Sequence, residues 1–246
     1  MKVFYHIGRY FILLTKVFQK PEKTYMFVDQ VFKEIMKLCI GSLGIISIIS
    51  FFLGAVITIQ TQSNISSALI PVYTVGFAVR QSMILELSPT IISLILAGKV
   101  GSNIASEIGT MRVTEQIDAL EIMGVNSASY LIFPKITATV LINPFLIILS
   151  MGIAIFGGWL AGIFTDIVAS HDFIYGVQYD FKSFSVTYAM IKTVVFAFII
   201  TSVPAYHGYY TNGGSLEVGS SSTKAVVYSS IAILIMNYIL TQLLLI

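Results

Sequence analysis

The sequence predicts an all-α integral membrane protein, in which one amphipathic N-terminal helix precedes five transmembrane helices. Of the 246 residues, 56% are hydrophobic and only 11% are charged, whereas about 25% of the residues of a soluble domain carry charge. Several apolar stretches are long enough to cross a bilayer, which takes roughly 20 residues of α-helix. A chain of this composition cannot cover its surface with polar groups, so we expect it to be embedded in a membrane.

Residues 1–33 lead into the membrane region, and their first half has the pattern of a helix that lies along the membrane surface. Five apolar residues recur at helical spacing on one face: Phe4, Ile7, Phe11, Leu14 and Phe18. Four basic residues recur every seven positions on the opposite face: Lys2, Arg9, Lys16 and Lys23. Such a helix binds the bilayer interface with its basic face toward anionic headgroups. We expect it to end near Pro21, and we favour it over a signal or transit peptide, because a compact apolar core is missing and acidic residues soon follow.

Residues 34–246 form the predicted membrane domain, with spans at about 38–59, 82–105, 136–165, 188–206 and 225–246. The first span carries no charge, and the second contains Glu86 and Lys99. The third is longer than one crossing needs, so we expect it to tilt or to protrude. The fourth is expected to bend or to end near Pro204.

The basic residues predict the orientation of the chain. Seven of them precede the first span: Lys2, Arg9, Lys16, Lys20, Lys23, Lys33 and Lys37. Because lysine and arginine are enriched on the cytoplasmic side of membrane spans, we expect a cytoplasmic N-terminus. Five crossings then place the C-terminus outside, with segments 107–135 and 207–224 inside and segment 166–187 outside.

Between the second and third spans, a small-residue helix is predicted to run without a break into a short charged helix at about 110–124. In that helix, acidic residues three apart accompany an apolar strip: Glu115, Asp118 and Glu121 beside Val113, Ile117 and Leu120. Gly124 is a typical stop, because glycine readily adopts the left-handed conformation that ends a helix. A helix of mixed acidic and apolar character suits docking into a groove of a partner, although a solvated loop helix has the same composition.

This stretch resembles the signature of the MlaE/YrbE permeases, the membrane subunits of ABC-type phospholipid transporters that work with MCE-domain proteins. Three segments carry the resemblance: Glu86-Leu87-Ser88-Pro89, residues 97–102 and residues 107–125. The similarity extends over roughly residues 30–246. It implies an MlaE-like permease that acts as a homodimer in the bacterial inner (cytoplasmic) membrane, with a periplasmic C-terminus.

The resemblance also implies partners and site residues. The helix at 110–124 looks like the coupling helix that seats in a separate ABC ATPase subunit. That partner would bind ATP and Mg, because this chain has no G-x-x-x-x-G-K-[ST] motif, and no cofactor, metal or nucleic acid is expected here. The implied coupling residues are Glu107, Thr110, Arg112, Glu115, Gln116, Asp118, Leu120, Glu121 and Gly124. The implied substrate is a phospholipid that moves between the inner membrane and an MCE-domain protein, toward or from the outer membrane.

Glu86 and Pro89 are the candidate residues of the lipid pathway. A carboxylate within a span is costly, and it usually faces a cavity or a partner charge. In the MlaE-like pattern an arginine precedes this glutamate, and here Leu85 stands in that position. Arg80 is then a candidate partner, if the chain folds back. The alternative is that Glu86 lies at the outer interface and simply meets water.

Two other classes of function stay open, an integral-membrane lipid-modifying enzyme and a structural scaffold. An enzyme needs converging groups such as a metal pair or paired carboxylates, whereas His6, His171 and His207 are scattered along the sequence. A scaffold would explain the small residues four apart in the third span: Gly157 with Ala161, and Gly158 with Gly162. Such residues let helices pack closely, either within the chain or between subunits. A scaffold does not explain a coupling-like helix, so a permease is favoured.

Overall fold

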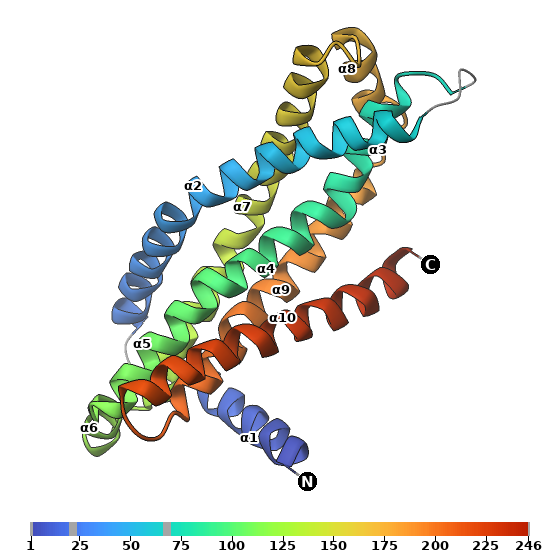
Figure 1. Cartoon of the computed structure of the whole chain (residues 1–246). Coiled ribbons are helices and arrows are strands. Elements are labelled where there is room, and N and C mark those ends of the chain that lie inside the picture. Colours follow the sequence, from blue (N-terminus) through green and yellow to red (C-terminus); the bar gives the residue numbers. More distant parts are fainter. Residues whose placement is uncertain (1, 20–23, 66–69, 246) are drawn as a thin grey trace. The chain divides into compact units, whose positions relative to one another are not determined.

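A computed structural model describes residues 2–19, 24–65 and 70–245 of the chain. Most of these residues are helical, and none of them forms a β-strand. In chain order the elements (Figure 1) are α1 Lys2–Val17, α2 Thr24–Asn64, α3 Thr74–Ser82, η1 Met83–Ile91, α4 Ile92–Leu96, η2 Ala97–Gly101, α5 Ser102–Val113, α6 Gln116–Ile122, α7 Ser127–Phe164, α8 Ser170–Gln178, α9 Ser183–Tyr209 and α10 Ser215–Leu245.

Five helical stretches within the described residues are long and apolar enough to cross a membrane: Tyr25–Asn64, Thr74–Val113, Ser127–Phe164, Ser183–Tyr209 and Ser215–Leu244. They confirm the predicted all-α fold with five membrane-spanning helices. Each stretch begins before the predicted span, and the first, second and fourth also end after it. Hydropathy marks only the apolar part of a helix, whereas the backbone hydrogen bonding continues into the polar flanks.

The second stretch joins α3, η1, α4, η2 and α5 into one helical run. Two π-helical segments interrupt its α-helical hydrogen bonding, and the first of them, η1, contains Pro89. Proline has no N–H to donate to the carbonyl four residues earlier, so a regular α-helix is interrupted there. The wider π turn keeps the run continuous. Glu86 and Pro89 therefore share a segment whose backbone departs from the regular helix.

The chain divides into two compact units, which are described separately. Unit 1 comprises Met1–Cys39, Ser93–Asn143 and Val194–Ile246, and unit 2 comprises Ile40–Ile92 and Pro144–Thr193. Within unit 1, α10 lies along α5 (Figure 1). A β-carbon at Gly208 of α9 would come within 2.7 Å of the Ala105 carbonyl oxygen on α5, so α9 and α5 approach closely only because this residue is glycine.

Within unit 2, α3 pairs with α8 (Figure 1), and α2 approaches α7 through glycines. A β-carbon at Gly157 would overlap the backbone carbonyl of Phe51 on α2, and one at Gly158 would collide with the Thr58 hydroxyl. These small residues of the third span therefore serve packing within the chain. The core of the unit is apolar: Val75, Val79, Met83, Ala154, Val168 and Phe173.

α1 packs on α9 within unit 1. The His6 Nδ1 atom lies 2.7 Å from the Tyr206 hydroxyl, and the hydroxyls of Tyr10 and Ser202 are 2.8 Å apart. Burial raises the pKa of the Tyr10 hydroxyl above its ordinary value. The inner face of α1 therefore combines these polar contacts with the buried apolar side chains of Leu13 and Val17.

The outer face of α1 carries the apolar side chains that the sequence assigns to it. Four of them are exposed: Phe4, Ile7, Phe11 and Phe18. Arg9 does not extend away from the protein, because its guanidinium lies 3.6 Å from the centre of the Tyr210 ring. Lys23 and the expected end near Pro21 lie outside the described residues, as does the side chain of Lys2. The location of α1 at the membrane interface stays a prediction.

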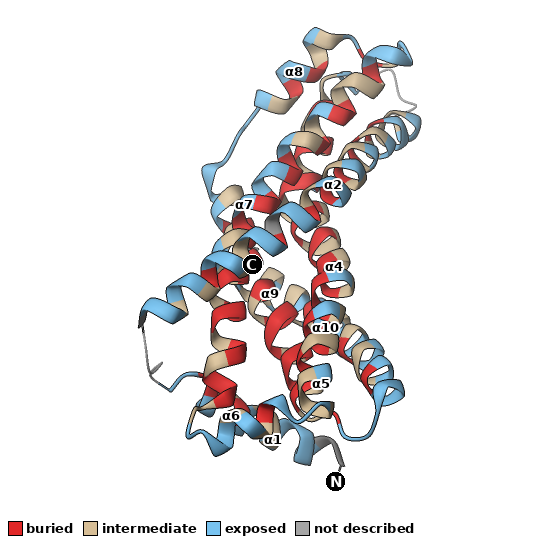
Figure 2. Cartoon of the chain, turned by 90° about the vertical axis from the view of Figure 1, so that its left-hand side faces the viewer, coloured by how far each residue is buried: buried red, intermediate tan, exposed pale blue. Residues whose placement is uncertain are grey.

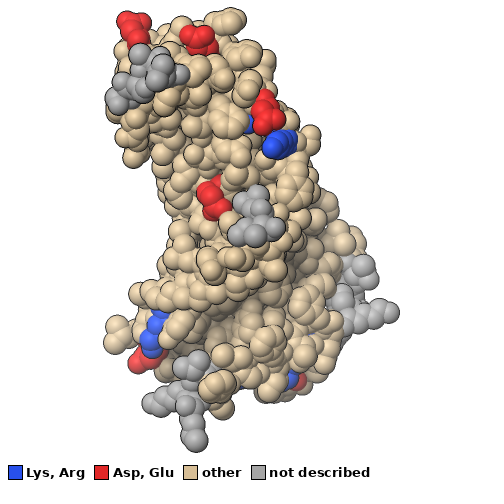
Figure 3. Space-filling model, turned by 90° about the vertical axis from the view of Figure 1, so that its right-hand side faces the viewer, with Lys and Arg blue, Asp and Glu red and all other residues tan. Residues whose placement is uncertain are grey.

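Large apolar side chains are exposed along the candidate spans (Figure 2). On α10 they include Val227, Tyr228, Ile231, Leu234, Ile235 and Tyr238. Figure 3 shows a face on which few charged side chains interrupt an otherwise uncharged surface. Soluble proteins rarely expose continuous apolar surface of this kind, whereas lipid tails solvate it.

Candidate docking helix and buried charge pairs

α5 and α6 are separate helices, so the expectation of an unbroken run into a helix at 110–124 is wrong. α5 ends at Val113, and α6 begins at Gln116. Between them Glu115 adopts a left-handed conformation with φ 60° and ψ 13°, which a right-handed helix of L-residues does not contain. Arg112 pairs with Asp118 across the break at 2.6 Å, and this ion pair braces the end of α5 against α6.

The break divides the expected coupling residues between the two helices. Those on α5 are Glu107, Thr110 and Arg112, those on α6 are Gln116, Asp118, Leu120 and Glu121, and Glu115 and Gly124 flank α6. The structure therefore does not bring all nine together on one helix face.

Gly124 ends the turn that follows α6, as the sequence predicts. Its φ is +79°. The Val125 N–H donates to the Leu120 carbonyl at 3.0 Å, and the Gly124 N–H donates to the Glu121 carbonyl at 3.0 Å. This pair of hydrogen bonds is the Schellman motif, in which a left-handed residue satisfies the last carbonyls of a helix.

The exposed apolar residues of this region differ from the predicted strip. Ile117 is fully buried, and Val113 is half-buried and belongs to α5, so the three residues do not form one exposed strip on α6. Instead, Ile122 and Met123 are 88% and 68% exposed at the end of α6. We call these two residues the α6 tip. An apolar pair directly before a helix-ending glycine is the signal in the sequence that would have found them.

The Glu121 carboxylate turns back toward the protein. The Ser127 hydroxyl and the Tyr209 hydroxyl both donate to its Oε1 atom at 2.9 Å. These two hydrogen bonds lower the pKa of Glu121 below its ordinary value. Both donors are buried, so Glu121 ties α6 to the start of α7 and the end of α9.

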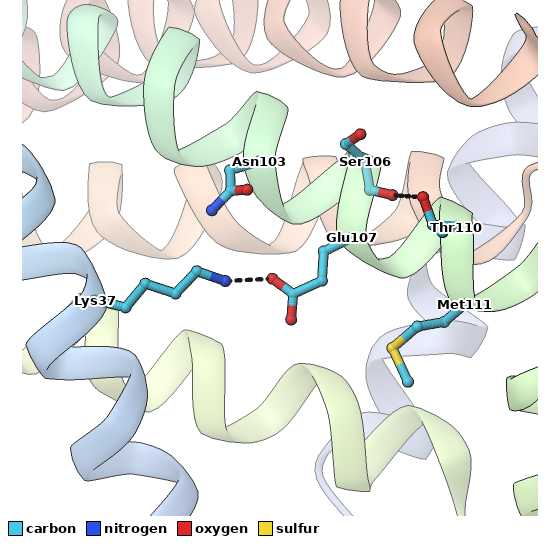
Figure 4. A pocket seen from close by; sticks show the side chains of 6 residues that line it. All are labelled: Lys37, Asn103, Ser106, Glu107, Thr110 and Met111. Carbon is cyan, nitrogen blue, oxygen red and sulfur yellow. Dashed lines mark hydrogen bonds and ion pairs between the residues drawn. The ribbon is translucent and has the colours of Figure 1, made fainter. Parts of the chain in front are cut away.

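Glu107 belongs to an ionic cluster that joins α2, α5 and α7 in unit 1. The Lys135 ammonium, which is almost fully buried, pairs with Glu34 and lies 2.9 Å from Glu107. Lys37 pairs with the other Glu107 oxygen at 2.7 Å (Figure 4). Buried charges are tolerated only when they are paired. The two lysines and two glutamates alternate, so their ion pairs hold α2, α5 and α7 together.

An open pocket of about 380 Å³ lies beside this cluster (Figure 4). Its lining residues are Lys37, Asn103, Ser106, Glu107, Thr110 and Met111. The Thr110 hydroxyl donates to the Ser106 carbonyl at 2.8 Å, so this expected coupling residue hydrogen-bonds within α5.

In unit 2, Glu86 pairs with a lysine that the sequence analysis missed. The Lys192 ammonium lies 2.6 Å from Glu86 Oε1, and its side chain is fully buried while that of Glu86 is 40% exposed. The Tyr188 hydroxyl donates to the same carboxylate oxygen at 3.2 Å. Glu86 therefore does not simply meet water. A lysine within an apolar span is itself a functional signal, and it would have pointed to this pair.

Arg80 is not the partner of Glu86, so that expectation is wrong. Its guanidinium donates to the carbonyls of Val177 and Tyr179 at 2.9 Å, at the end of α8. The last carbonyls of a helix have no partner within it and carry partial negative charge. A buried cation there satisfies them and fixes α8 on α3.

Pro89 is buried beside the Glu86 pair. Because proline has no N–H, the Leu85 carbonyl loses its usual α-helical donor. The Lys192 ammonium lies 3.4 Å from that carbonyl oxygen. One lysine thus binds both the carboxylate of Glu86 and the carbonyl that Pro89 leaves without its α-helical partner.

The sequence model described as Permease MlaE matches residues 31–243. This chain belongs to the MlaE permease family. It is 36% identical to a probable ABC transporter permease protein of Rickettsia bellii, over 96% of this chain and 91% of that protein. It is 32% identical to the intermembrane phospholipid transport system permease protein MlaE of Haemophilus influenzae, over 85% of this chain and 80% of that protein.

The chain is also similar to a plant protein. The chain is 33% identical to the chloroplastic protein trigalactosyldiacylglycerol 1 of Arabidopsis thaliana, over 82% of this chain and 57% of that protein. Residues 31–243 of the MlaE match contain the α6 tip, the ionic cluster around Lys135 and the Glu86–Lys192 pair. All three features therefore lie in the part of the chain that is similar to the family.

Proposed function

We propose that this chain is the permease subunit of an ABC-type phospholipid transporter. The family match over residues 31–243 carries the proposal, together with five helices long and apolar enough to span a membrane. The name of the relative from Haemophilus influenzae supplies the substrate class. The lipid would move between the inner membrane and an MCE-domain partner, toward or from the outer membrane.

The ATPase partner would bind the α6 region on the cytoplasmic side. Support comes from the exposed apolar tip, Ile122 and Met123, because an exposed apolar patch rimmed by polar groups is typical of an interaction site. The polar side chains of Glu115 and Gln116, at the start of α6, are exposed as well. An ABC transporter presents two docking helices to two ATPase subunits, so a homodimer of this chain is part of the proposal.

The lipid pathway would pass Glu86 and Pro89. The carboxylate is 40% exposed while its partner Lys192 is fully buried, so the acidic side of the pair is open to a lipid headgroup or to water. The π-helical backbone around Pro89 supports this assignment, because such segments are frequent at functional sites. A lipid-modifying enzyme and a scaffold have less support, since the relatives named above include two transporter permeases.

The test is purification of the tagged full-length chain from native membranes, followed by reconstitution into vesicles. We expect an ABC ATPase and an MCE-domain protein to copurify in the native mass spectrum. We also expect ATP to drive transfer of a fluorescent phospholipid, whereas a non-hydrolysable analogue does not. Absence of an ATPase from the complex, or lipid transfer that ignores ATP, would refute the proposal. Covalent change of the lipid without ATP would favour the enzyme.

A further inference from the structure

We infer that Glu121 is a positioning residue, which fixes the direction of the α6 tip and does not itself contact the ATPase. The identity of the partner as an ATPase rests on the proposed function, whereas the orientation of the α6 tip is measured on this chain alone. Among the residues expected to couple to an ATPase, Glu121 is the one that accepts two hydrogen bonds from buried hydroxyls. One oxygen of its carboxylate, Oε1, is thus engaged within the protein.

Glu121 joins three helices at one point. Ser127 begins α7 and Tyr209 ends α9, and their hydroxyl oxygens are 2.8 Å apart. Both hydroxyls reach the same oxygen of Glu121 at 2.9 Å. A hydrogen bond to an ionised acceptor is roughly twice as strong as one between neutral groups. The position of Glu121 relative to α7 and α9 is therefore held from two directions.

The turn after α6 is held as well, by α1. The side-chain amide of Asn126 donates to the Lys16 carbonyl at 3.0 Å and to the Gln19 side chain at 2.8 Å. The Ser129 hydroxyl donates to the Gln19 carbonyl at 3.0 Å. With the Arg112–Asp118 pair on the other side, both connections of α6 are fixed by side chains.

α6 needs these anchors because it is short. It has seven residues, and an isolated helix below about 12 residues is marginal in water. Only Ile117 of α6 is fully buried, so apolar packing restrains the helix mainly at that residue. The hydrogen bonds to Glu121 supply the missing restraint, next to the tip at Ile122 and Met123.

Substitution by glutamine separates positioning from direct contact. A glutamine side chain keeps an acceptor oxygen for the Ser127 and Tyr209 hydroxyls and loses the negative charge. If Glu121 positions α6, Glu121→Gln should retain the orientation of the tip and the binding of the ATPase. If its charge meets a cation of the ATPase, Glu121→Gln should lose binding although the orientation is unchanged.

The experiment measures the distance between spin labels at Met123→Cys and Leu216→Cys in a Cys39→Ser background. Both labelled positions are exposed in unit 1. The variants are Glu121→Ala, Glu121→Gln and the pair Ser127→Ala with Tyr209→Phe. Asp29→Ala is the matched control, because it removes an exposed carboxylate that pairs only with exposed Lys33 among the described ion pairs. The same variants at Glu121, at Ser127 with Tyr209 and at Asp29, made without the two labelling cysteines, are tested for copurification of the ATPase that accompanies the wild type.

We expect one narrow distance in the wild type, Glu121→Gln and Asp29→Ala, and a broad distribution in Glu121→Ala and in the hydroxyl pair variant. ATPase binding should fall roughly tenfold only in the two broad variants. A narrow distance in Glu121→Ala overturns the inference, and so does loss of ATPase binding by Glu121→Gln with a narrow distance. If Glu121→Ala fails to fold, the hydroxyl pair variant decides by the same criteria. A wild type that binds no ATPase refutes the proposed function, while the distances still decide the positioning role.

Discussion

Lys192 is a buried cation of unit 2 whose counter-charge is supplied by Glu86. It is fully buried, and it binds Glu86 and the Leu85 carbonyl. Removing one partner of a buried ion pair leaves an uncompensated charge, which costs about 3–5 kcal/mol, whereas replacing both partners by neutral groups is often harmless. A single neutral substitution at Glu86 therefore affects stability as well as any role in transport.

A double substitution separates these two effects. Glu86→Gln alone should lower the melting temperature, and adding Lys192→Met should restore most of it, because no buried charge then remains unpaired. If the pair serves the lipid pathway, the double variant should still lack lipid-stimulated ATPase activity in the reconstituted complex. Melting curves and ATPase rates check this. Wild-type activity of the stable double variant would contradict a role for Glu86 in the pathway.

The Glu121 carboxyl predicts a dependence of stability on pH. Hydrogen bonds from Ser127 and Tyr209 lower its pKa in the folded protein. A lowered folded-state pKa contributes stability that is present above the unfolded-state pKa and is lost as the pH falls through the folded-state value. Glu121→Gln should therefore melt below the wild type at neutral pH, and the difference should shrink under acid conditions. Paired melting curves across the acid range test this, and a constant difference would contradict it.

At the scale of elements, the break at Glu115 decides what α6 presents to a partner. The break separates α6 from α5, and in α6 the Ile117 side chain is buried. The apolar contact surface is consequently the tip, and Asp118 is engaged with Arg112. Reversing the charge of Asp118 would disturb the brace of α6 itself, so substitution of the tip is the cleaner test of docking.

We expect Ile122→Asp combined with Met123→Asp to abolish copurification of the ATPase and to leave the melting temperature unchanged. Both side chains are largely exposed, so their replacement removes little packing, whereas carboxylates placed in an apolar groove are costly to desolvate. Leu216→Asp is the matched control, because Leu216 is 82% exposed on α10. Unchanged ATPase binding by the tip variant would contradict a docking role and favour the alternative that α6 is a solvated loop helix.

For the whole molecule, the feature that the sequence predicts is its orientation in the membrane. The basic residues before the first span predict a cytoplasmic N-terminus. The described structure adds five helices that are long enough to cross. Because α9 lies between them, one crossing by α9 would place the α7–α9 connection and the α9–α10 connection on opposite sides of the membrane.

Cysteine labelling tests this arrangement. His171→Cys and Leu216→Cys, each in a Cys39→Ser background, carry exposed side chains at the two connections. A membrane-impermeant thiol reagent should label His171→Cys in intact cells after permeabilisation of the outer membrane alone. It should label Leu216→Cys only after the inner membrane is opened. Labelling of both from the same side would contradict the five-span topology.

The sequence by itself determined the features that depend on neighbours along the chain. Hydropathy fixes which stretches prefer lipid, so the five helices were predicted, and Gly124 was predicted because a helix stop needs only a local left-handed residue. The segments 86–89, 97–102 and 107–125 were sufficient for the family resemblance. The lengths of the five helices were underpredicted, because each helix continues beyond its apolar part.

Only the tertiary structure decided which charges meet. Glu86 and Lys192 are 106 residues apart in the sequence, and Lys135 and Glu107 are 28 apart, so no local pattern relates them. The same holds for Glu121, whose hydroxyl donor on Tyr209 comes from the end of another helix, 88 residues away. Periodicity shows which face of a helix is apolar, whereas helix packing decides which group pairs with a buried charge. The reason is that burying a charge is costly unless another helix supplies its counter-charge or hydrogen bond.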